Sequence, residues 1–155
     1  MLKPVSTEKT EVGGGRFAIV ASKYNALYVD AMVQAAQRTL TDSGANAVEV
    51  VRVPGAYEIP VVAARLADSP AQPFSALICL GVVLRGQTVH AQLISESVTA
   101  ALMHIQLQTG VPVIHEVLLL ENEDQARKRC LDPEHNRGTE AAQTALEMAQ
   151  IMQQL

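Results

Sequence analysis

Short apolar runs alternate along the chain with longer segments of helical periodicity. The apolar runs lack a regular polar alternation, which is typical of strands buried on both faces of a sheet. The longer segments repeat apolar residues every three or four positions, and this repeat predicts helices that pack on one side. The predicted strands are residues 17–21, 47–53, 74–83 and 111–120, and the predicted helices are residues 27–40, 59–67, 89–108, a segment after Asn122 that reaches Cys130, and residues 140–154.

Residues that begin or end helices support these limits. Asn25 can cap the start of the first helix, and Gly44 suits its C-terminal turn. Gly110 stops the long helix, and Asn122, with a glutamine three positions later, begins the next one in the manner of a capping box. Thr139 is the predicted cap of the last helix.

The order of the elements predicts the fold class. Strands and helices alternate, so the sheet should be parallel with helices on both faces. We therefore expect an α/β fold, specifically a flavodoxin-like three-layer α/β/α sandwich with a four-stranded parallel sheet. Residues 16–155 are expected to form one domain, and the polar residues 1–15, which end in three glycines, to form a flexible N-terminal arm.

Composition and charge narrow the class of function. The chain has no Trp, two Phe and three Tyr, so its core must be built from aliphatic side chains. A net charge of −4 without a basic patch argues against a nucleic-acid partner or an anionic membrane surface. The sequence has neither a membrane-spanning apolar run nor the apolar core of a signal peptide, so we expect a cytoplasmic protein. Cys79 and Cys130 have no metal-ligand spacing, which indicates buried reduced thiols and no metal site.

The stretch from Gly81 to His90 carries the first chemical signal. It links a predicted strand to the long helix through a loop that contains Gly86, Gln87 and Thr88. The unpaired N–H groups of a helix N-terminus stabilise a bound anion, and a glycine lets the backbone approach it. His90, at the start of the helix, is suited to move a proton near neutral pH. Such junctions are common, and this loop alone leaves open an ordinary α/β connection with a surface histidine.

The other loops strengthen the case for a site. In parallel sheets flanked by helices, ligands bind beyond the carboxyl ends of the strands. Those ends carry the few aromatic and charged loop residues of the chain, namely Lys23-Tyr24-Asn25, Gly55-Ala56-Tyr57-Glu58, Arg85-Gly86-Gln87-Thr88 with His90, and the region near Glu121. The pattern indicates chemistry on a phosphorylated small molecule.

These motifs, in this order, resemble the 6,7-dimethyl-8-ribityllumazine synthase family over about residues 16–152. The family usually has Arg-Phe-Asn where this chain has Lys23-Tyr24-Asn25. The other matching motifs are Val53-Pro54-Gly55-Ala56-Tyr57-Glu58-Ile59-Pro60, Gly81 to His90, Glu121-Asn122-Glu123-Asp124-Gln125-Ala126 through Arg129, and Asn136-Arg137-Gly138.

The resemblance implies a reaction in riboflavin biosynthesis. Enzymes of the family condense 5-amino-6-(D-ribitylamino)uracil with 3,4-dihydroxy-2-butanone 4-phosphate, releasing phosphate and water without a cofactor. His90 would shuttle protons during imine formation, phosphate elimination and ring closure. Because one acid/base group supplies only part of the acceleration, much of the rate must come from holding two substrates together.

The resemblance also assigns binding residues. Tyr24 would stack on the uracil and Glu58 would accept hydrogen bonds from the ribityl hydroxyls, although by themselves they would suggest half-buried packing and a solvated carboxylate. Residues that would also line the ribitylaminouracil site are Asn25, Ala56, Tyr57, Val82, Val83, Leu84 and His115. Gln87, Thr88, Arg129 and Arg137 would hold the phosphorylated substrate.

Family members place each site between two subunits of a pentameric ring. One subunit would supply the loops up to His90, and its neighbour would supply the region of His115, Arg129 and Arg137. Many members join twelve pentamers into a hollow icosahedral shell. We expect a homopentamer here and leave the shell open, because the connector 131–135 lacks the Gly-rich character of shell-forming relatives and contains Pro133.

Three departures from the family pattern bear on activity. Ala91-Gln92-Leu93 follows His90 where aromatic and acidic residues are usual, His115 replaces a Phe, and Arg137 replaces a Lys. They leave open a second hypothesis, a catalytically weak homologue kept as a flavin- or lumazine-binding scaffold or shell. A third hypothesis, a related pentamer that converts lumazine to riboflavin, should lack the Arg-Gly-Gln-Thr loop that this chain contains.

Overall fold

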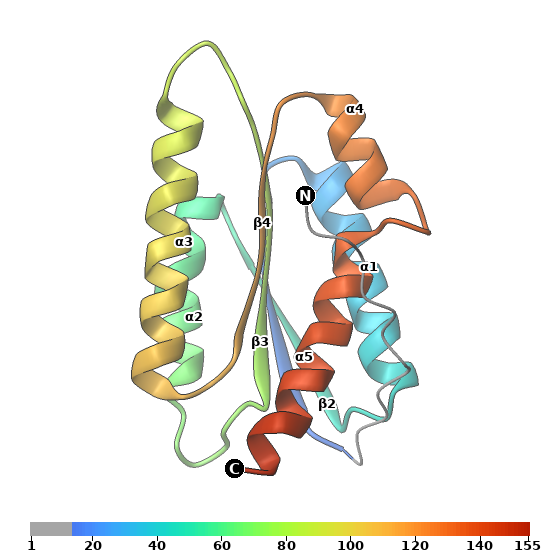
Figure 1. Ribbon diagram of the computed structural model, residues 1–155, viewed down its shortest axis with the longest axis vertical. Coiled ribbons are helices and arrows are strands. Elements are labelled where there is room, and N and C mark those ends of the chain that lie inside the picture. The colour runs from blue at the N-terminus through green and yellow to red at the C-terminus, as the bar shows by residue number, and fades with distance from the viewer. Residues whose placement is uncertain (1–13) are drawn as a thin grey trace.

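Four parallel strands between two layers of helices make up the computed structural model, which describes residues 14–155 (Figure 1). The strands are β1 (Arg16–Ser22), β2 (Ala47–Val53), β3 (Ala76–Leu84) and β4 (Val113–Leu120), in the spatial order β2-β1-β3-β4. The helices are α1 (Ala26–Asp42), α2 (Ile59–Ala67), α3 (His90–Thr109), α4 (Glu123–Ala126) and α5 (Arg137–Gln153), with a 3-10 turn η1 (Ala56–Glu58) and a π-helical turn η2 (Arg127–Leu131). The predicted flavodoxin-like α/β/α sandwich is confirmed.

The two faces of the sheet bury separate apolar cores. Helices α2 and α3 lie on one side of the sheet, and α1, α4 and α5 lie on the other (Figure 1). Alternate residues of β1 serve the two cores, since Phe17 and Ile19 pack toward α1 and α5 while Ala18 and Val20 pack toward α2 and α3. A strand covered on both faces must be apolar throughout, which explains the unbroken runs in the sequence.

Most predicted helix ends are confirmed. Gly44 and Gly110 have the left-handed backbone of helix C-terminal turns, with φ of 93° and 70°. The Asn122 side chain accepts from the Gln125 N–H at 2.9 Å at the start of α4. Asn25 stands at the N-terminus of α1, but its side chain makes no cap hydrogen bond.

The predicted cap of the last helix is wrong. Helix α5 begins at Arg137, so Thr139 lies inside its first turn. The cap is Asn136, whose side-chain oxygen accepts from the Gly138 N–H at 2.8 Å while its amide nitrogen donates to the Cys130 carbonyl at 2.7 Å. Because Asn136 is buried and bonded to η2, it fixes the start of α5 three residues before the predicted first residue of the helix.

Two strand limits also differ from the prediction. Phe74 is buried but lies before β3, where the Arg16 guanidinium stacks on its ring at 4.0 Å from the centroid. Strand β4 begins at Val113, two residues later than predicted. Cys79 and Cys130 are buried free thiols, as expected.

Most of the predicted N-terminal arm, residues 1–13, lies outside the described residues. Gly14 and Gly15 belong to the described part, and the Gly15 carbonyl accepts from the Asn46 N–H at 2.9 Å. Between residues 14 and 155, no helix is long and apolar enough to cross a membrane.

We expect Gly138→Ala to destabilise the fold by about 2 kcal/mol, because overpacking a close contact typically costs about 1–3 kcal/mol. A Cβ at this position would overlap the main chain of Met32, so α5 would have to move away from α1. Thermal unfolding of the variant should show the loss. Gly86→Ala is the control, since a Cβ there meets no atom within 4 Å; equal unfolding temperatures for both variants would contradict the proposed contact.

Candidate active site

A pocket of about 770 Å³ opens where the strands end. It lies between the loops after β1 and β2, the end of β3 and the first two turns of α3, and its volume is within the usual range for small-molecule sites. It contains His90 and all the residues predicted to bind ribitylaminouracil except His115. Its lining consists of Tyr24, Asn25, Gly55, Ala56, Tyr57, Glu58, Val82, Val83, Leu84, His90, Leu93, Ile94 and Ser97.

Two tyrosines form an aromatic wall of the pocket. Tyr24 is 71% exposed and Tyr57 is 65% exposed, so both rings are accessible to a ligand or a partner. Tyr24 approaches the loop after β2 so closely that a Cβ on Gly55 would lie 3.1 Å from its ring. A Cβ at position 55 would also lie 2.9 Å from Glu58 Oε2, so a larger residue there would displace the side chains of Tyr24 and Glu58.

Glu58 combines a local structural contact with a free acceptor. Its Oε2 atom accepts from the Gly55 N–H at 2.9 Å and closes the turn η1. A carboxylate can accept about four hydrogen bonds, so Oε1 and the remaining lone pair of Oε2 stay available. The bond to Gly55 restricts where the carboxylate can point, which suits a fixed acceptor for ligand hydroxyls.

His90 is the first residue of α3 and lines the pocket. Its backbone N–H donates to the Thr88 hydroxyl at 3.4 Å, so Thr88 satisfies one of the free N–H groups at the start of the helix. In the described part of the chain no side-chain hydrogen bond holds the exposed imidazole. The ring is therefore free to meet a substrate.

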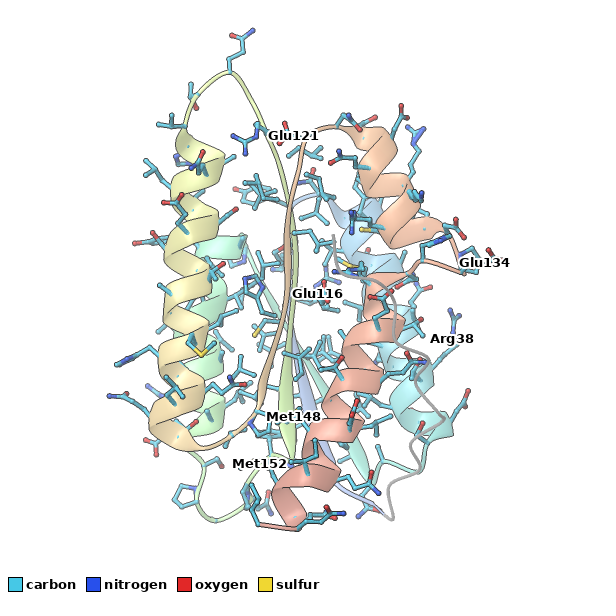
Figure 2. All side chains as sticks on the ribbon, in the orientation of Figure 1. Arg38, Glu116, Glu121, Glu134, Met148 and Met152 are labelled. Atoms are coloured by element: carbon cyan, nitrogen blue, oxygen red, sulfur yellow. The ribbon has the colours of Figure 1, made fainter. Side chains whose placement is uncertain are left out.

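The loop between β3 and α3 is anchored at its base. Arg85 donates from Nε to the Glu121 carboxylate at 2.9 Å and from its backbone N–H to the Leu120 carbonyl at 2.8 Å. Figure 2 shows Glu121 at the edge where the strands end. Gln87 and Thr88 are exposed beyond this anchor and beside His90, but they do not line the pocket. No contact within residues 14–155 requires glycine at position 86, so the close approach of an anion there stays a prediction.

Three predicted site residues lie away from the pocket of their own chain. His115 is in the middle of β4, Arg129 is in η2, and Arg137 begins α5. His115 faces α3, whereas the two arginines belong to the opposite helical layer. A single chain therefore brings together the ribitylaminouracil residues and His90, but not these three.

His115 is held as a neutral imidazole. Its Nδ1 atom accepts from the Val117 N–H at 3.1 Å, which leaves the proton on Nε2, 2.7 Å from the Thr99 hydroxyl. Burial lowers the pKa of His115 below its usual 6.5. The ring orientation is thus set by two partners, Thr99 and the main chain.

The lowered pKa of His115 predicts a pH-dependent stability. The folded state takes up this proton less readily than the unfolded state, so the stabilising contribution is complete above pH 6.5 and is lost as the pH falls through the lower folded pKa. We expect the unfolding temperature of the wild type to fall more steeply below pH 6.5 than that of His115→Phe. His104→Phe, at an exposed position of α3, is the control. Parallel pH curves for wild type and His115→Phe would refute this contribution.

Arg137 already has two carboxylate partners. It donates from Nε to Glu116 at 3.2 Å and from a terminal nitrogen to Glu140 at 2.5 Å. Burial raises the pKa of Glu116, and the nearby Arg137 opposes that rise. Figure 2 shows Glu116 on β4, beside α5. Arg129 has no hydrogen-bond partner among the described residues, so it is the freer of the two guanidinium groups.

Sequence reasoning missed three pocket residues on α3. Leu93, Ile94 and Ser97 follow His90 by three, four and seven positions, and they line the pocket with it. Residues at this spacing share one face of a helix, so the helical repeat counted from His90 would have identified them. Glu116 was also missed, because a single carboxylate within an apolar strand gives no indication of its partner.

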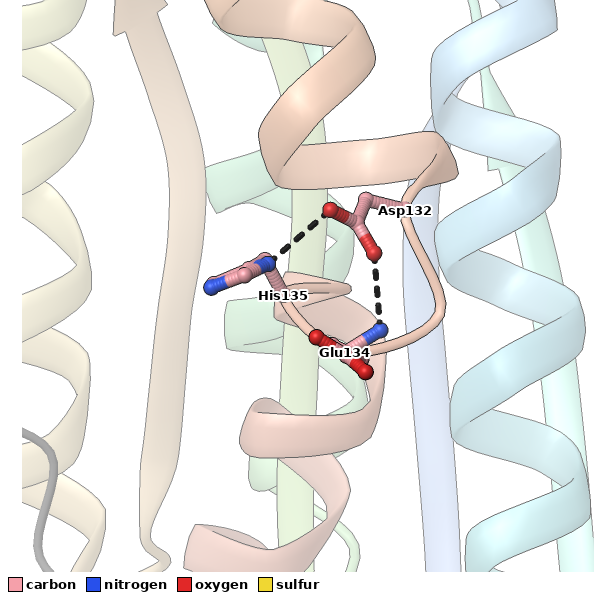
Figure 3. Close-up of side chains that lie close together, drawn as sticks. All are labelled: Asp132, Glu134 and His135. Atoms are coloured by element: carbon pink, nitrogen blue, oxygen red, sulfur yellow. Dashed lines mark hydrogen bonds and ion pairs between the residues drawn. The ribbon is translucent and has the colours of Figure 1, made fainter.

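One group of three side chains in residues 14–155 has the composition of a metal site. Asp132, Glu134 and His135 in the connector before α5 place their ligand atoms within 4.8 Å of one another (Figure 3). Asp132 accepts from the Glu134 N–H and pairs with His135 Nδ1, both at 3.0 Å, and these bonds lower its pKa. The group is largely exposed, and its polar atoms serve the turn of the connector.

Comparison with known proteins identifies close similarity along nearly the whole chain. The family model described as 6,7-dimethyl-8-ribityllumazine synthase matches residues 14–153. The chain is 44% identical to the 6,7-dimethyl-8-ribityllumazine synthase of Xylella fastidiosa (strain 9a5c) over 144 residues, which cover 92% of each chain. It is 43% identical to the protein of the same name from Xanthomonas oryzae pv. oryzae (strain PXO99A) over 142 residues, covering 90% of this chain and 91% of the relative.

Proposed function

Because this chain belongs to the 6,7-dimethyl-8-ribityllumazine synthase family, we propose that its pocket holds 5-amino-6-(D-ribitylamino)uracil beside a loop that binds 3,4-dihydroxy-2-butanone 4-phosphate. The protein is a transferase of riboflavin biosynthesis that condenses these two compounds to 6,7-dimethyl-8-ribityllumazine, with release of phosphate and water. The observation that carries the residue assignments is the convergence of three strand ends and His90 on one pocket.

Ribitylaminouracil is bound by the aromatic wall and the end of β3. Tyr24 stacks on the uracil ring, and Tyr57 covers the ribityl chain. Glu58 accepts hydrogen bonds from ribityl hydroxyls through the lone pairs that Gly55 leaves free. The rest of the site is lined by the main chain of Ala56, Val82, Val83 and Leu84. Its fit to the substrate depends on the shape of the backbone more than on the identity of these side chains.

The phosphorylated substrate is bound by charge and by the exposed loop. Gln87 and Thr88 offer side-chain donors next to His90, and Arg129 of an adjacent subunit supplies a guanidinium. Arg129 suits this role because its donors have no hydrogen-bond partner within residues 14–155, and a guanidinium binds phosphate oxygens in a bidentate manner. Arg137, committed to Glu116 and Glu140, contributes positive charge near the phosphate more than direct hydrogen bonds.

His90 acts as the proton shuttle. Imine formation, phosphate elimination and ring closure each move a proton between substrate and solvent, and the exposed imidazole reaches both. Proximity supplies the remaining acceleration, since the pocket and the loop hold the two reactants beside each other.

Assembly completes the site. The protein forms a homopentamer in which His115, Arg129 and Arg137 of one subunit face the pocket of the next. Exposed apolar side chains on α3 support such an interface, since Leu93, Met103 and Leu107 are 56%, 54% and 76% exposed in the single chain. The connector 131–135 leaves the joining of pentamers into a shell open, and the cytoplasmic location stays a prediction.

The test is formation of 6,7-dimethyl-8-ribityllumazine by the purified protein, followed by absorbance together with phosphate release. We expect a rate well above the slow uncatalysed condensation, and a sedimentation coefficient of a pentamer or a larger assembly. A folded, assembled protein that binds the lumazine product but releases no phosphate would favour the scaffold hypothesis. An active monomer would contradict a site shared between subunits.

A further inference from the structure

Asn25 has a backbone conformation that stands out at the pocket. Its φ of 57° and ψ of 45° are left-handed, and it is the only non-glycine residue with positive φ in the described part of the chain. Asparagine tolerates this region better than most residues, but a helix N-cap normally has an extended backbone and a side chain that accepts from the helix. Here the side chain makes no such bond, so capping does not explain the residue.

The side chain instead extends the hydrogen bonding of the sheet. Strands β1 and β3 are in register up to the pair Ala21 and Leu80, after which β1 turns away into its loop. Val82 lies two residues beyond that pair, and its carbonyl accepts from Asn25 Nδ2 at 2.8 Å. The amide therefore joins the loop after β1 to the part of β3 that forms the pocket.

The same loop is joined to β2 by its main chain. The Lys23 N–H donates to the Val53 carbonyl at 2.8 Å, and the Tyr24 N–H donates to the Pro54 carbonyl at 3.2 Å. Within residues 14–155, main-chain hydrogen bonds thus join the loop at Tyr24 to β2, and the Asn25 amide makes its one hydrogen bond to β3. Removing that amide would free one side of the aromatic wall.

We propose that Asn25 is a positioning residue, which uses its amide to hold the Tyr24 ring at a fixed distance from the end of β3. Its Nδ2 serves Val82 and not the substrate. The inference rests on the proposed function, since it gives Asn25 a role in forming the ribitylaminouracil site. The proposed role does not extend to the loop with Gln87, Thr88 and His90. That loop is anchored independently, by the hydrogen bond between Arg85 and Glu121.

Two variants isolate the amide. Asn25→Gly keeps the left-handed backbone and removes the side chain. Asn25→Asp tolerates the same backbone and keeps an acceptor oxygen, but it has no donor for the Val82 carbonyl. Asn46→Asp, at the opposite end of the strands, is the matched control. Circular dichroism and sedimentation report whether each variant is folded and assembled.

Both Asn25 variants should raise the KM for ribitylaminouracil between about twofold and tenfold, the range expected for one hydrogen bond. The kcat and the KM for the phosphorylated substrate should stay within about twofold of the wild type, because the anchor of the second site is intact. Titration with 6,7-dimethyl-8-ribityllumazine should show the same loss of affinity at equilibrium, and Asn46→Asp should behave as wild type.

Three outcomes would overturn the proposal. Unchanged affinity in Asn25→Gly would mean that the amide bond positions nothing. Normal affinity in Asn25→Asp with a loss in Asn25→Gly would mean that the side-chain oxygen contacts the ligand directly. A fall in kcat without a change in KM would place the role in the chemical step. Lack of lumazine synthesis by the wild type would instead refute the proposed function, and the product titration would still test Asn25.

Discussion

Replacement of His90 by alanine should lower kcat by about 10²-fold, the lower end of the range for a positioned acid/base group. The lower end is expected because the His90 side chain is exposed, so water can take over part of the proton transfer. The fold and the affinity for both substrates should be preserved, since no hydrogen bond in residues 14–155 depends on the imidazole. Steady-state kinetics with the two substrates varied in turn would measure kcat and both KM values.

Two further variants make the His90 result specific. His104→Ala removes an exposed histidine from the same helix and should leave kcat unchanged. His90→Gln keeps a polar side chain of similar size without a titratable group, so it should be as slow as the alanine variant if proton transfer is the role. A kcat equal to that of the wild type in either His90 variant would remove His90 from catalysis.

The fold could be predicted from the sequence because each step depended on local pattern and on rules of topology. Apolar runs without alternation indicated strands covered on both faces, and the two central strands β1 and β3 are such strands. The edge strands β2 and β4 are only partly buried and carry the charged residues Glu49, Arg52 and Glu116. Because the sheet was predicted to be parallel, the loops containing Tyr24, Glu58 and His90 were expected to meet at the carboxyl ends of its strands. The pocket contains all three, as that argument required.

The errors arose where the role of a residue depends on a partner that is distant in the sequence. Thr139 satisfies the local pattern of a cap, but Asn136 takes that role because its amide also bonds the carbonyl of Cys130 and that of Ala31, which is 105 positions away. Asn25 satisfies the same pattern, yet its amide bonds Val82, which is 57 positions away. Whether a residue caps a helix depends on the local sequence and also on its tertiary contacts. Only the local contribution can be deduced from neighbouring residues.

The two predicted phosphate-binding arginines also differ in a way that the sequence could not predict. Sequence alone gives Arg129 and Arg137 the same chemistry. The fold separates them, because Arg137 lies between the half-buried Glu116 and the exposed Glu140, whereas Arg129 has no hydrogen-bond partner in the described part of the chain. Glu116 stands in the middle of an apolar strand, and its pairing with α5 depends on the packing of the two layers. We therefore expect Arg129 to contribute more than Arg137 to phosphate binding.

Arg129→Ala should raise the KM for 3,4-dihydroxy-2-butanone 4-phosphate between about 10-fold and 100-fold, because a hydrogen bond to a charged group contributes about 1.5–3 kcal/mol. The KM for ribitylaminouracil should change little, since that substrate carries no phosphate. Kinetics at saturating ribitylaminouracil would measure the effect, and Arg129→Lys should recover part of it, because lysine keeps the charge but not the bidentate geometry.

Arg127 provides the matched control for Arg129. It lies in the same turn η2, is similarly exposed, and pairs with Glu123 at 3.4 Å. Arg127→Ala removes an equal charge two positions away and should leave both KM values near those of the wild type. If the two alanine variants raise the KM for the phosphorylated substrate equally, the effect is the loss of general positive charge. If neither does, Arg129 does not bind the phosphate, and Arg137 would have to leave Glu116 to do so.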